Sequence, residues 1–223
     1  MVYIDYMLRP ITLIGAVAVV IGMEARAATP ILFDFDDCPV NTGLPYVTLP
    51  RYGVQATLTP VPNAPTDNGY AFWPIGTAGA SPVGMGGTCI YPSGVFLTDL
   101  QIEFNQPISD FSILYSPHEL STDSSATLQI KAYNGGTLLG SNTDQITGLD
   151  VYTWPTGTLH YAATAFDKVV LHYYSGPPIG GDYGVIFIVD NMQVVPVPEP
   201  ASALLLLIGG AAMGLRRRRY EGE

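Results

Sequence analysis

Three aspartates could together bind a metal ion, although they lie far apart in the chain. Asp34 and Asp36 end the first short run of alternating apolar residues, and Asp190 lies in the last such run. Carboxylate oxygens are the ligands that Ca²⁺ takes in proteins. If the first and last strands lie side by side, these three side chains could hold a structural Ca²⁺. The alternative needs no ion, because strand alternation would turn Asp34 and Asp36 to solvent while Asp37 caps the turn before Pro39.

Cys38 and Cys89 are the only cysteines of the chain, and they could form one disulfide. An even number of cysteines is typical of proteins that fold in an oxidising compartment. A bond closing this loop of about 50 residues would contribute about 4 kcal/mol in the chain-entropy description. Two unpaired thiols are the alternative, because nothing in the sequence sets the distance between them.

The chain is rich in aromatic side chains, with 14 tyrosines and two tryptophans. Several lie near acidic or amide residues, and we single out Trp73, Trp154 and Tyr183 as candidate ligand-binding residues. A flat aromatic ring beside hydrogen-bonding groups can stack on a sugar ring and combine apolar burial with polar contacts. For any single one of them, the simpler explanation is an ordinary strand or core residue.

Residues suited to catalysis are scattered in this sequence. His118, His160 and His172 show no metal-ligand spacing, and no Gly-x-Ser-x-Gly turn is present. We therefore predict that the protein is not an enzyme. A glycan hydrolase is the alternative, which would need two carboxylates such as Asp99 and Glu103 to line one cleft.

The segments that must position these residues alternate with a period of two. In one of them Leu128, Ile130 and Ala132 share a face, as in a half-buried strand. Asn134-Gly135-Gly136 follows and suits a tight hairpin, since these residues accept positive φ angles. No segment has a helical period, and no repeat recurs at a fixed spacing. The sequence therefore predicts an all-β, antiparallel β-sandwich of the jelly-roll type, with further strands at residues 31–35, 54–58, 96–104, 108–115, 166–173 and 185–195.

The central part of the chain is strongly acidic. Residues 28–195 contain three cations, Arg51, Lys131 and Lys168, against 14 aspartates and glutamates, which leaves a formal charge of −11. Nucleic-acid binding needs clustered lysine and arginine, so we expect no nucleic-acid partner. The abundance of Gly, Pro, Ser, Thr and Tyr is typical of a turn-rich exported β domain.

The N-terminal segment has the features of a secretory signal peptide. Residues 11–23 form an apolar run, Arg9 precedes it, and Ala25-Arg26-Ala27 follows with the small-x-small pattern of a signal-peptidase site. The run is shorter than the ~20 residues that a spanning helix needs. We therefore predict a signal peptide over residues 1–27 that is cut after Ala27, with a retained membrane anchor as the alternative.

The C-terminal segment combines three elements in a fixed order. Val197-Pro198-Glu199-Pro200 comes first, an apolar run over residues 203–215 follows, and the chain then carries Arg216, Arg217, Arg218 and Arg219. The prolines stop a preceding strand, and the arginines hold the end of a transmembrane helix in the cytoplasm. At about 1.5 Å per residue the run spans about 20 Å, against a hydrocarbon core of ~30 Å. Such a short helix suits temporary attachment to the membrane better than permanent anchoring.

This order of elements resembles the PEP-CTERM sorting signal. The resemblance covers about an eighth of the chain and implies an exosortase-type membrane protease as partner, which recognises and processes the tail. It also implies transient insertion in the inner membrane of a Gram-negative bacterium that makes extracellular polysaccharide. The mature chain is then expected at the cell surface or in the extracellular matrix of a biofilm.

A second resemblance concerns the central domain, which we place at residues 28–195, before a sorting signal at residues 196–223. Its Phe33-Asp34-Phe35, Ile102-Glu103-Phe104 and Phe187-Ile188-Val189-Asp190-Asn191 are similar to segments of jelly-roll domains in other PEP-CTERM proteins. They also resemble, more distantly, carbohydrate-binding modules. The resemblance implies a non-catalytic domain that binds polysaccharide. Two alternatives stay open, a secreted glycan hydrolase and a purely structural biofilm-matrix protein.

Overall fold

The computed structural model describes residues 29–44, 47–61, 70–75, 82–92, 99–117, 126–146, 156–173 and 187–198. The predicted signal peptide at residues 1–27 and the predicted membrane segment at residues 203–215 lie outside these ranges. Every regular element within them is a β-strand, and they contain no helix that is long and apolar enough to cross a membrane. Thr29–Val197 forms one compact unit.

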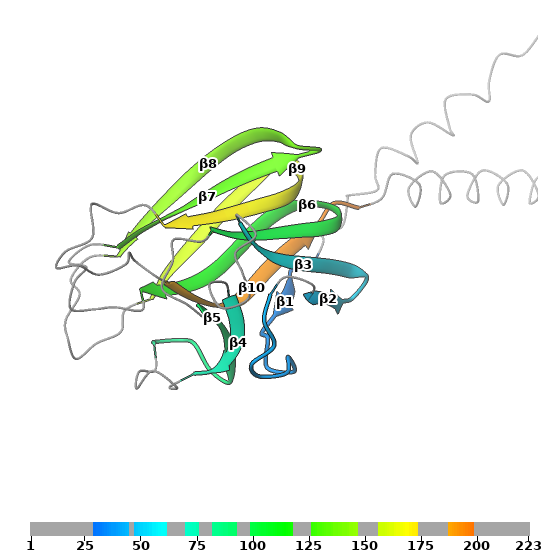
Figure 1. Ribbon diagram of the computed structural model, residues 1–223. Helices are drawn as coiled ribbons and strands as arrows, with labels where there is room; N and C mark the ends of the chain where they lie inside the picture. The colour runs from blue at the N-terminus through cyan, green and yellow to red at the C-terminus, as the bar shows by residue number, and fades with distance from the viewer. Residues whose placement is uncertain are drawn as a thin grey trace, which may run out of the picture. The chain divides into compact units, whose positions relative to one another are not determined.

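Ten strands make up the described part of this unit, and all of their pairings are antiparallel. The predicted all-β, antiparallel class is therefore confirmed. The strands of Figure 1 are β1 (Ile31–Phe33), β2 (Val47–Arg51), β3 (Val54–Val61), β4 (Tyr70–Pro74), β5 (Thr88–Pro92), β6 (Asp99–Pro117), β7 (Ala126–Asn134), β8 (Thr137–Ile146), β9 (Gly157–Tyr173) and β10 (Phe187–Pro196).

The two longest strands, β6 and β9, pair with each other and bend sharply (Figure 1). Their register shifts between Glu103 and Asp110, because each strand carries residues that the other does not match. The rings of Phe104 and Phe111 on β6 come within 6.3 Å of each other, whereas a straight strand would separate the two residues by about 23 Å. Unmatched residues of this kind are what allows a strand to bend.

The two halves of the bent pair join different neighbours. The first half of β6 pairs with β3, which pairs with β2, and the second half of β9 pairs with β7, which pairs with β8. These strands form the first sheet, β2-β3-β6-β9-β7-β8. The second half of β6 pairs with β10, which carries β1 and also β5 and β4. Together with the first half of β9, these strands form the second sheet. Because β6 and β9 belong to both sheets, hydrogen bonds connect all ten strands.

The core lies between the two sheets. Along β6, Leu100, Ile102 and Phe104 point inward from the first sheet, and Phe111 and Ile113 point inward from the second. All five belong to one hydrophobic cluster, to which each of the ten strands contributes. The bend therefore lets one strand contact the same core twice. Burial of apolar surface stabilises the fold by about 25 cal/mol per Å², so this shared core is its main support.

Contacts at both sides close the edges of the sandwich. On one side β1 of the second sheet contacts β2 of the first. On the other side β8 lies beside the first half of β9, where Asn142 Nδ2 donates a hydrogen bond to His160 O at 3.0 Å. Gly140 lies so close to Tyr161 that an added Cβ would be 2.8 Å from its hydroxyl. These strand edges are thereby covered rather than left as templates for pairing.

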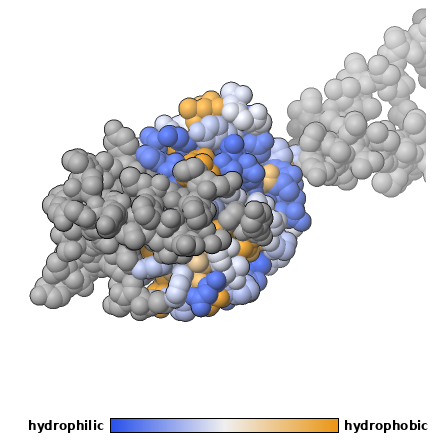
Figure 2. Space-filling model, in the orientation of Figure 1, coloured by the Kyte–Doolittle hydropathy of each residue, from blue (hydrophilic) through white to orange (hydrophobic). Residues whose placement is uncertain are grey.

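The described surface is mostly hydrophilic in the view of Figure 2, where hydrophobic residues form small separate patches. Exposed large apolar residues include Val83, Leu138 and Leu139. Scattered apolar residues are normal on a protein surface and do not by themselves mark a binding site. A candidate site therefore has to come from polar groups.

Gly157, the first residue of β9, allows a test of this packing. A Cβ at this position would lie 2.5 Å from Asp144 Oδ2 and 2.5 Å from Tyr115 Cε1, and Tyr115 is fully buried. We expect Gly157→Ala to destabilise the domain by about 1–3 kcal/mol, because overpacking forces neighbours to move. Gly43→Ala is the control, since an added Cβ there meets nothing within 4 Å. Urea denaturation measures both variants, and equal stabilities would contradict the packing described.

Candidate functional site

The first and last strands lie side by side, as the candidate site requires. β1 pairs with β10 as far as Met192, and β5 pairs with β10 at Val189. Asp190 and Asn191 lie between these two pairings. β10 has a bulge at this point, because its register with β6 shifts between Asp190 and Gln193 and because Asn191 has a φ of 50°. The residues that follow β1 therefore meet Asp190 at the position where β10 changes its partner.

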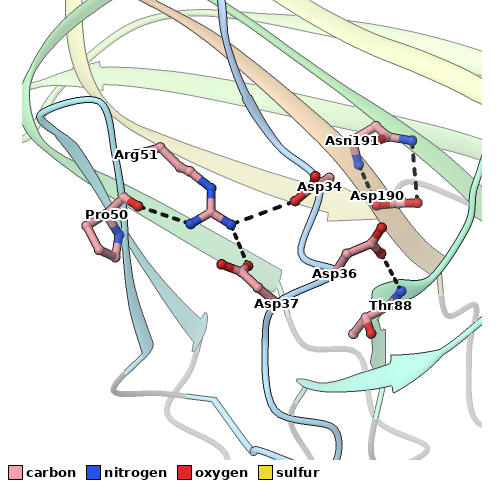
Figure 3. Close-up of polar contacts among 8 residues, drawn as sticks. All are labelled: Asp34, Asp36, Asp37, Pro50, Arg51, Thr88, Asp190 and Asn191. Atoms are coloured by element: carbon pink, nitrogen blue, oxygen red, sulfur yellow. Dashed lines mark hydrogen bonds and ion pairs between the residues drawn. The ribbon is translucent and has the colours of Figure 1, made fainter.

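Five charged residues gather at this position (Figure 3), and we call them the acidic junction: Asp34, Asp36, Asp37, Arg51 and Asp190. The chain leaves β1 through Phe35, whose φ of 60° is rare for an aromatic residue. Cys38 N donates to Phe35 O at 2.9 Å and closes the turn. This turn directs Asp34 and Asp37 toward Arg51, and Asp36 toward Thr88 and Asp190 (Figure 3).

Arg51, the last residue of β2, joins the two sheets. Its guanidinium forms an ion pair with Asp37 and lies 3.7 Å from Asp34 Oδ1. The hydrogen bond between Arg51 and Asp37 lowers the pKa of the Asp37 carboxyl and raises the pKa of Arg51. Exposed ion pairs contribute little stability by themselves. Because β2 belongs to the first sheet and the aspartates follow β1 of the second, these ion pairs link the two sheets.

Asp36 is positioned by the start of β5. Its Oδ1 accepts a hydrogen bond from Thr88 N at 2.8 Å. The carboxylate also lies against Gly87, where an added Cβ would be 1.8 Å from Asp36 Oδ1. Gly87 has a φ of 58°, a conformation that glycine adopts far more readily than other residues. Glycine at position 87 is therefore required for Asp36 to reach β5.

Asp190 is the buried member of the acidic junction, with 1% of its surface exposed. Gly86 N donates to Asp190 Oδ2 at 3.1 Å, and Asn191 N donates to Asp190 Oδ1 at 2.7 Å. Burial raises the pKa of Asp190 to about 6, and the charges of Asp36 and Asp34 act in the same direction. The described residues place no cation against this carboxyl group. Backbone N–H groups therefore hold it, and part of the group stays protonated in mildly acidic solution.

The predicted Ca²⁺ site at these side chains stays a prediction. Asp34, Asp36 and Asp190 lie in one region, but the described ranges contain no group of three Asp, Glu, His or Cys side chains that could hold a metal ion. Asp34 faces Arg51, while Asp36 and Asp190 accept hydrogen bonds from backbone N–H groups. Strand order predicted that the three residues meet. It could not reveal that each carboxylate has a protein partner of its own.

Asp99 and Glu103, the carboxylates of the hydrolase alternative, do not share a cleft. Both project from the outer side of β6 in the first sheet, about 13 Å apart along the strand. Asp99 Oδ1 lies 2.6 Å from His172 Nδ1, and Glu103 Oε1 lies 4.0 Å from Lys168 Nζ. The two carboxyl groups of glycosidases lie about 5–9.5 Å apart. The backbone positions of Asp99 and Glu103 thus lie farther apart than the carboxyl groups of a glycosidase.

The two described histidines do not share a site either. His172 pairs with Asp99 on the first sheet, whereas His160 Nε2 lies 3.1 Å from Asp110 Oδ2 on the second. The two histidines lie on opposite sides of the bend in β9. His118, the third histidine of the sequence, lies outside the described residues.

The outer face of the first sheet is an open polar surface. No side chain that the described strands place on it is fully buried. We call this surface the open face, and it carries Thr57, Thr59, Gln101, Glu103, Gln129, Lys131, Tyr133, Lys168, Val170 and His172. Strand register aligns these residues in rows, so that Glu103, Lys168 and Tyr133 are successive neighbours. Lys168 Nζ lies 5.0 Å from the Tyr133 ring centroid, and Gln101 Nε2 donates to Glu103 Oε1 at 3.1 Å.

The outer face of the second sheet is covered in part, in contrast. The segment 82–87 lies against it, and Asn191 Nδ2 donates to Gly84 O at 3.0 Å. Thr156 Oγ1 donates to Val83 O at 2.9 Å. Cys89 and Ser116, which β5 and β6 place on this face, are buried. In the described part of the molecule, the open face is therefore the more accessible of the two outer faces.

Trp73 is the one described member of the three predicted aromatic ligand-binding residues. It lies on β4 at the edge of the second sheet, half-buried, with its ring 6.2 Å from that of Tyr91. Its indole Nε1 is buried and has no hydrogen-bond partner among the residues that the structure describes. Trp154 and Tyr183 lie outside those residues. A ligand-binding role for these three side chains stays a prediction.

Cys38 and Cys89 are free in the structure, which does not join them in the predicted disulfide. Both thiols are buried, and burial raises the pKa of Cys38 to about 11 and the pKa of Cys89 to about 12. Cys89 Sγ also donates to Trp73 O at 3.5 Å. An even cysteine count suggested a bond, but the distance between the thiols depends on the turn after β1 and on the β4–β5 pairing. Protonated, buried thiols react slowly.

The predicted sorting tail begins inside the sheet. β10 continues to Pro196, which is opposite Ile108 of β6, and Val197 N donates to Pro107 O at 2.9 Å. The boundary predicted after residue 195 therefore falls within β10, and Pro198, which follows the half-buried Val197, is exposed. Glu199, Pro200 and the arginines at 216–219 lie outside the described residues, so their separate roles stay predictions.

Comparison with protein families matches residues 196–219 to the PEP-CTERM protein-sorting motif. The chain thus carries this sorting signal at the position that its sequence pattern indicated, and the resemblance is confirmed. The motif marks an exported protein that is attached to the membrane before it is processed. No curated protein matches the sequence.

Several solved structures align with this chain at low similarity. The K2 cleaved adhesin domain of Lys-gingipain (Kgp) is 9% identical, with 76% of this chain and 99% of that chain covered and a TM-score of 0.43. The CBM22-1 xylan-binding domain from Paenibacillus barcinonensis Xyn10C is 14% identical, with coverages of 79% and 99% and a TM-score of 0.39. The family 32 CBM from C. perfringens NanJ in complex with galactose is 13% identical, with coverages of 66% and 96% and a TM-score of 0.31. Similarity this low carries no ligand or activity over to this chain.

Sequence reasoning missed Arg51 and Gly87 as parts of the acidic junction. Arg51 could have been noticed as the only cation between Ala27 and Lys131, but its partners became visible only once β1 was paired with β10. Gly87 had no distinguishing signal, since the chain contains 24 glycines. The open face was not predicted as a candidate surface, although the alternation of β7 leaves Lys131 on the side opposite Leu128 and Ile130.

Asp190 gives the domain a stability that depends on pH. Its pKa in the folded state is about 6, above the ordinary value of 3.8. The stabilising contribution is fully present below pH 3.8 and is lost as the pH rises through about 6, because the unfolded chain releases this proton more easily. Over this window we expect the unfolding free energy of the wild type to fall by about 1–3 kcal/mol relative to Asp190→Asn, which cannot titrate.

Urea denaturation at a series of pH values measures this difference. Asp167→Asn is the control, because it also removes a carboxylate that accepts a backbone N–H group, that of Gly135, and it lies outside the acidic junction. This control should keep the wild-type slope. Calcium chloride should leave the melting temperature unchanged. A calcium-dependent rise that Asp190→Asn abolishes would instead show that the ion binds at the acidic junction.

Proposed function

We propose that this chain is an exported protein of the bacterial surface or extracellular matrix, whose sandwich binds polysaccharide without cleaving it. The single observation that carries the surface part is the PEP-CTERM protein-sorting motif at residues 196–219. In this proposal residues 1–27 are the signal peptide, residues 28–195 with the end of β10 are the functional domain, and the rest is the sorting signal.

An exosortase-type membrane protease is the proposed processing partner. The apolar run at residues 203–215 inserts transiently in the inner membrane, and the arginines at 216–219 stay on the cytoplasmic side because positive residues resist translocation. Glu199, between Pro198 and Pro200, is the residue that the protease recognises. After processing, the domain stays at the cell surface or in the matrix of a biofilm.

The open face supports polysaccharide binding. Gln101 and Gln129 offer both hydrogen-bond donors and acceptors, Thr57 offers a hydroxyl group, and Lys131 offers an ammonium group. Tyr133 adds an aromatic ring to the same surface. Side chains of these types satisfy sugar hydroxyls and stack on sugar rings. Neighbouring strands lie about 4.8 Å apart, so the groups form a regular array that fits an extended chain better than a small enclosed molecule.

Binding without turnover agrees with the carboxylates of this face. Asp99 and Glu103 each face a basic partner, His172 and Lys168. Glycoside cleavage needs two carboxyl groups that flank one bond of the substrate, whereas each of these carboxylates faces a partner of its own. Asp99 and Glu103 therefore do not support the hydrolase alternative.

Replacing amides on the two outer faces tests the binding proposal. A glycan array with the folded domain first identifies the polysaccharide, and affinity electrophoresis then compares variants. We expect Gln101→Ala and Gln129→Ala each to weaken binding about 3- to 10-fold, since one hydrogen bond contributes about 0.5–1.5 kcal/mol. Gln193→Ala is the matched control, because Gln193 is exposed on β10 of the second sheet. If only Trp73→Ala weakened glycan binding, the binding site would lie at β4 instead of the open face.

A wild-type domain that binds no glycan would contradict the binding proposal. The same result would favour a purely structural matrix protein.

Mass spectrometry tests the sorting proposal. In a host that has the sorting protease, the protein should lose about 2–3 kDa as a tail of ~25 residues leaves, in addition to the signal peptide. Glu199→Ala should leave membrane insertion intact and block this loss, and deletion of the protease gene should have the same effect. A mature surface protein that still carries Arg216 and Arg219 in a protease-positive host would mean that the tail is a permanent anchor.

A further inference from the structure

The sorting motif and the folded sheet share residues. The motif begins at residue 196, yet Pro196 is the last residue of β10 and is opposite Ile108 of β6. Val197 N donates to Pro107 O at 2.9 Å, and the compact unit ends at Val197. Pro198 is exposed and has no N–H group to donate. The sheet therefore holds the motif as far as Val197 and releases it at Pro198.

The residues before this point are held on both edges of β10. Val194 is opposite Ile31 of β1 and Phe111 of β6, and its side chain is fully buried. Ser109 Oγ donates to Val195 O at 3.3 Å. A protease needs a stretch of free backbone, so the position of a cut follows the burial and hydrogen bonding of the chain. A cut within β10 would require the strand to leave the core.

We propose that the membrane protease cuts the chain on the C-terminal side of Val197, so that the mature domain keeps its complete last strand. This inference rests on the proposed processing of the tail and assigns the position of the cut. The C–N bond of one peptide group beyond Val197 breaks, water supplies a hydroxyl group to the carbonyl carbon, and the remaining proton of the water goes to the departing amine.

The two prolines make this boundary sharp. Because neither Pro196 nor Pro198 can donate a hydrogen bond, Val197 N is the last donor of this strand end. A protease that cuts just beyond Val197 has to bind the residues before the cut, and the sheet binds the same residues. Processing therefore requires the last hydrogen bond of β10 to open, which is a local fraying event at a strand end.

The position of the cut is tested by mass spectrometry of the full chain after processing in a protease-positive host. We expect a mature C-terminus at Val197 or beyond it. A C-terminus at Pro196 or earlier overturns the proposal, while the proposed processing itself stands. A chain that keeps its arginines at 216–219 overturns both. The two failures are thus distinguishable by mass.

The requirement for fraying is tested by a flexible spacer. Inserting Gly-Ser-Gly-Ser between Val197 and Pro198 should speed tail removal roughly 3-fold or more in a pulse–chase experiment, because the residues before the cut are then free of the sheet. The matched control inserts the same spacer between Gly135 and Gly136, in the exposed β7–β8 hairpin, and should process at the wild-type rate. Equal rates for the two insertions overturn the link between processing and the sheet.

Discussion

A strand of 19 residues, β6, buries apolar side chains against the same core with both of its halves. A straight strand of that length would span about 60 Å and would carry its two halves far apart. The bend that β6 shares with β9 removes this conflict, and it is possible because unmatched residues in both strands absorb the change of direction. The two sheets, the closed core and the open face of the first sheet all depend on this shared bend.

The same bend determines where the sorting tail leaves the domain. Pro107 and Ile108, which hold Val197 and Pro196, lie in the stretch of β6 where its register with β9 shifts. One edge of β6 pairs with β3 before the bend and with β10 after it. The end of β10 therefore meets β6 at its bend, where pairing with β10 begins. Packing of the core and presentation of the tail are linked through these few residues.

The acidic junction shows how polar groups are accommodated where β10 changes partner. Strand alternation turns Asp190 away from the core, just before the bulge at Asn191, and two backbone N–H groups hold its carboxyl group. Burying a carboxylate without a cation is unfavourable, which is the reason for its raised pKa. Arg51 instead pairs with the exposed members Asp34 and Asp37, and so ties the first sheet to the second.

The sequence by itself determined the β class, part of the strands and the sorting motif, whereas β2, β4, β5 and β8 were not predicted and β6 was expected as two strands. These features are local, since alternation follows from a period of two along one segment, and the motif is a run of consecutive residues. It also predicted that Asp34 and Asp36 lie near Asp190. Only the tertiary structure decided that Arg51 and backbone N–H groups contact these carboxylates, that Cys38 and Cys89 are both buried, and that the sheet extends into the sorting motif. Each of these depends on which distant segments meet, and the bulges and bends that bring them together leave no periodic signal in the sequence.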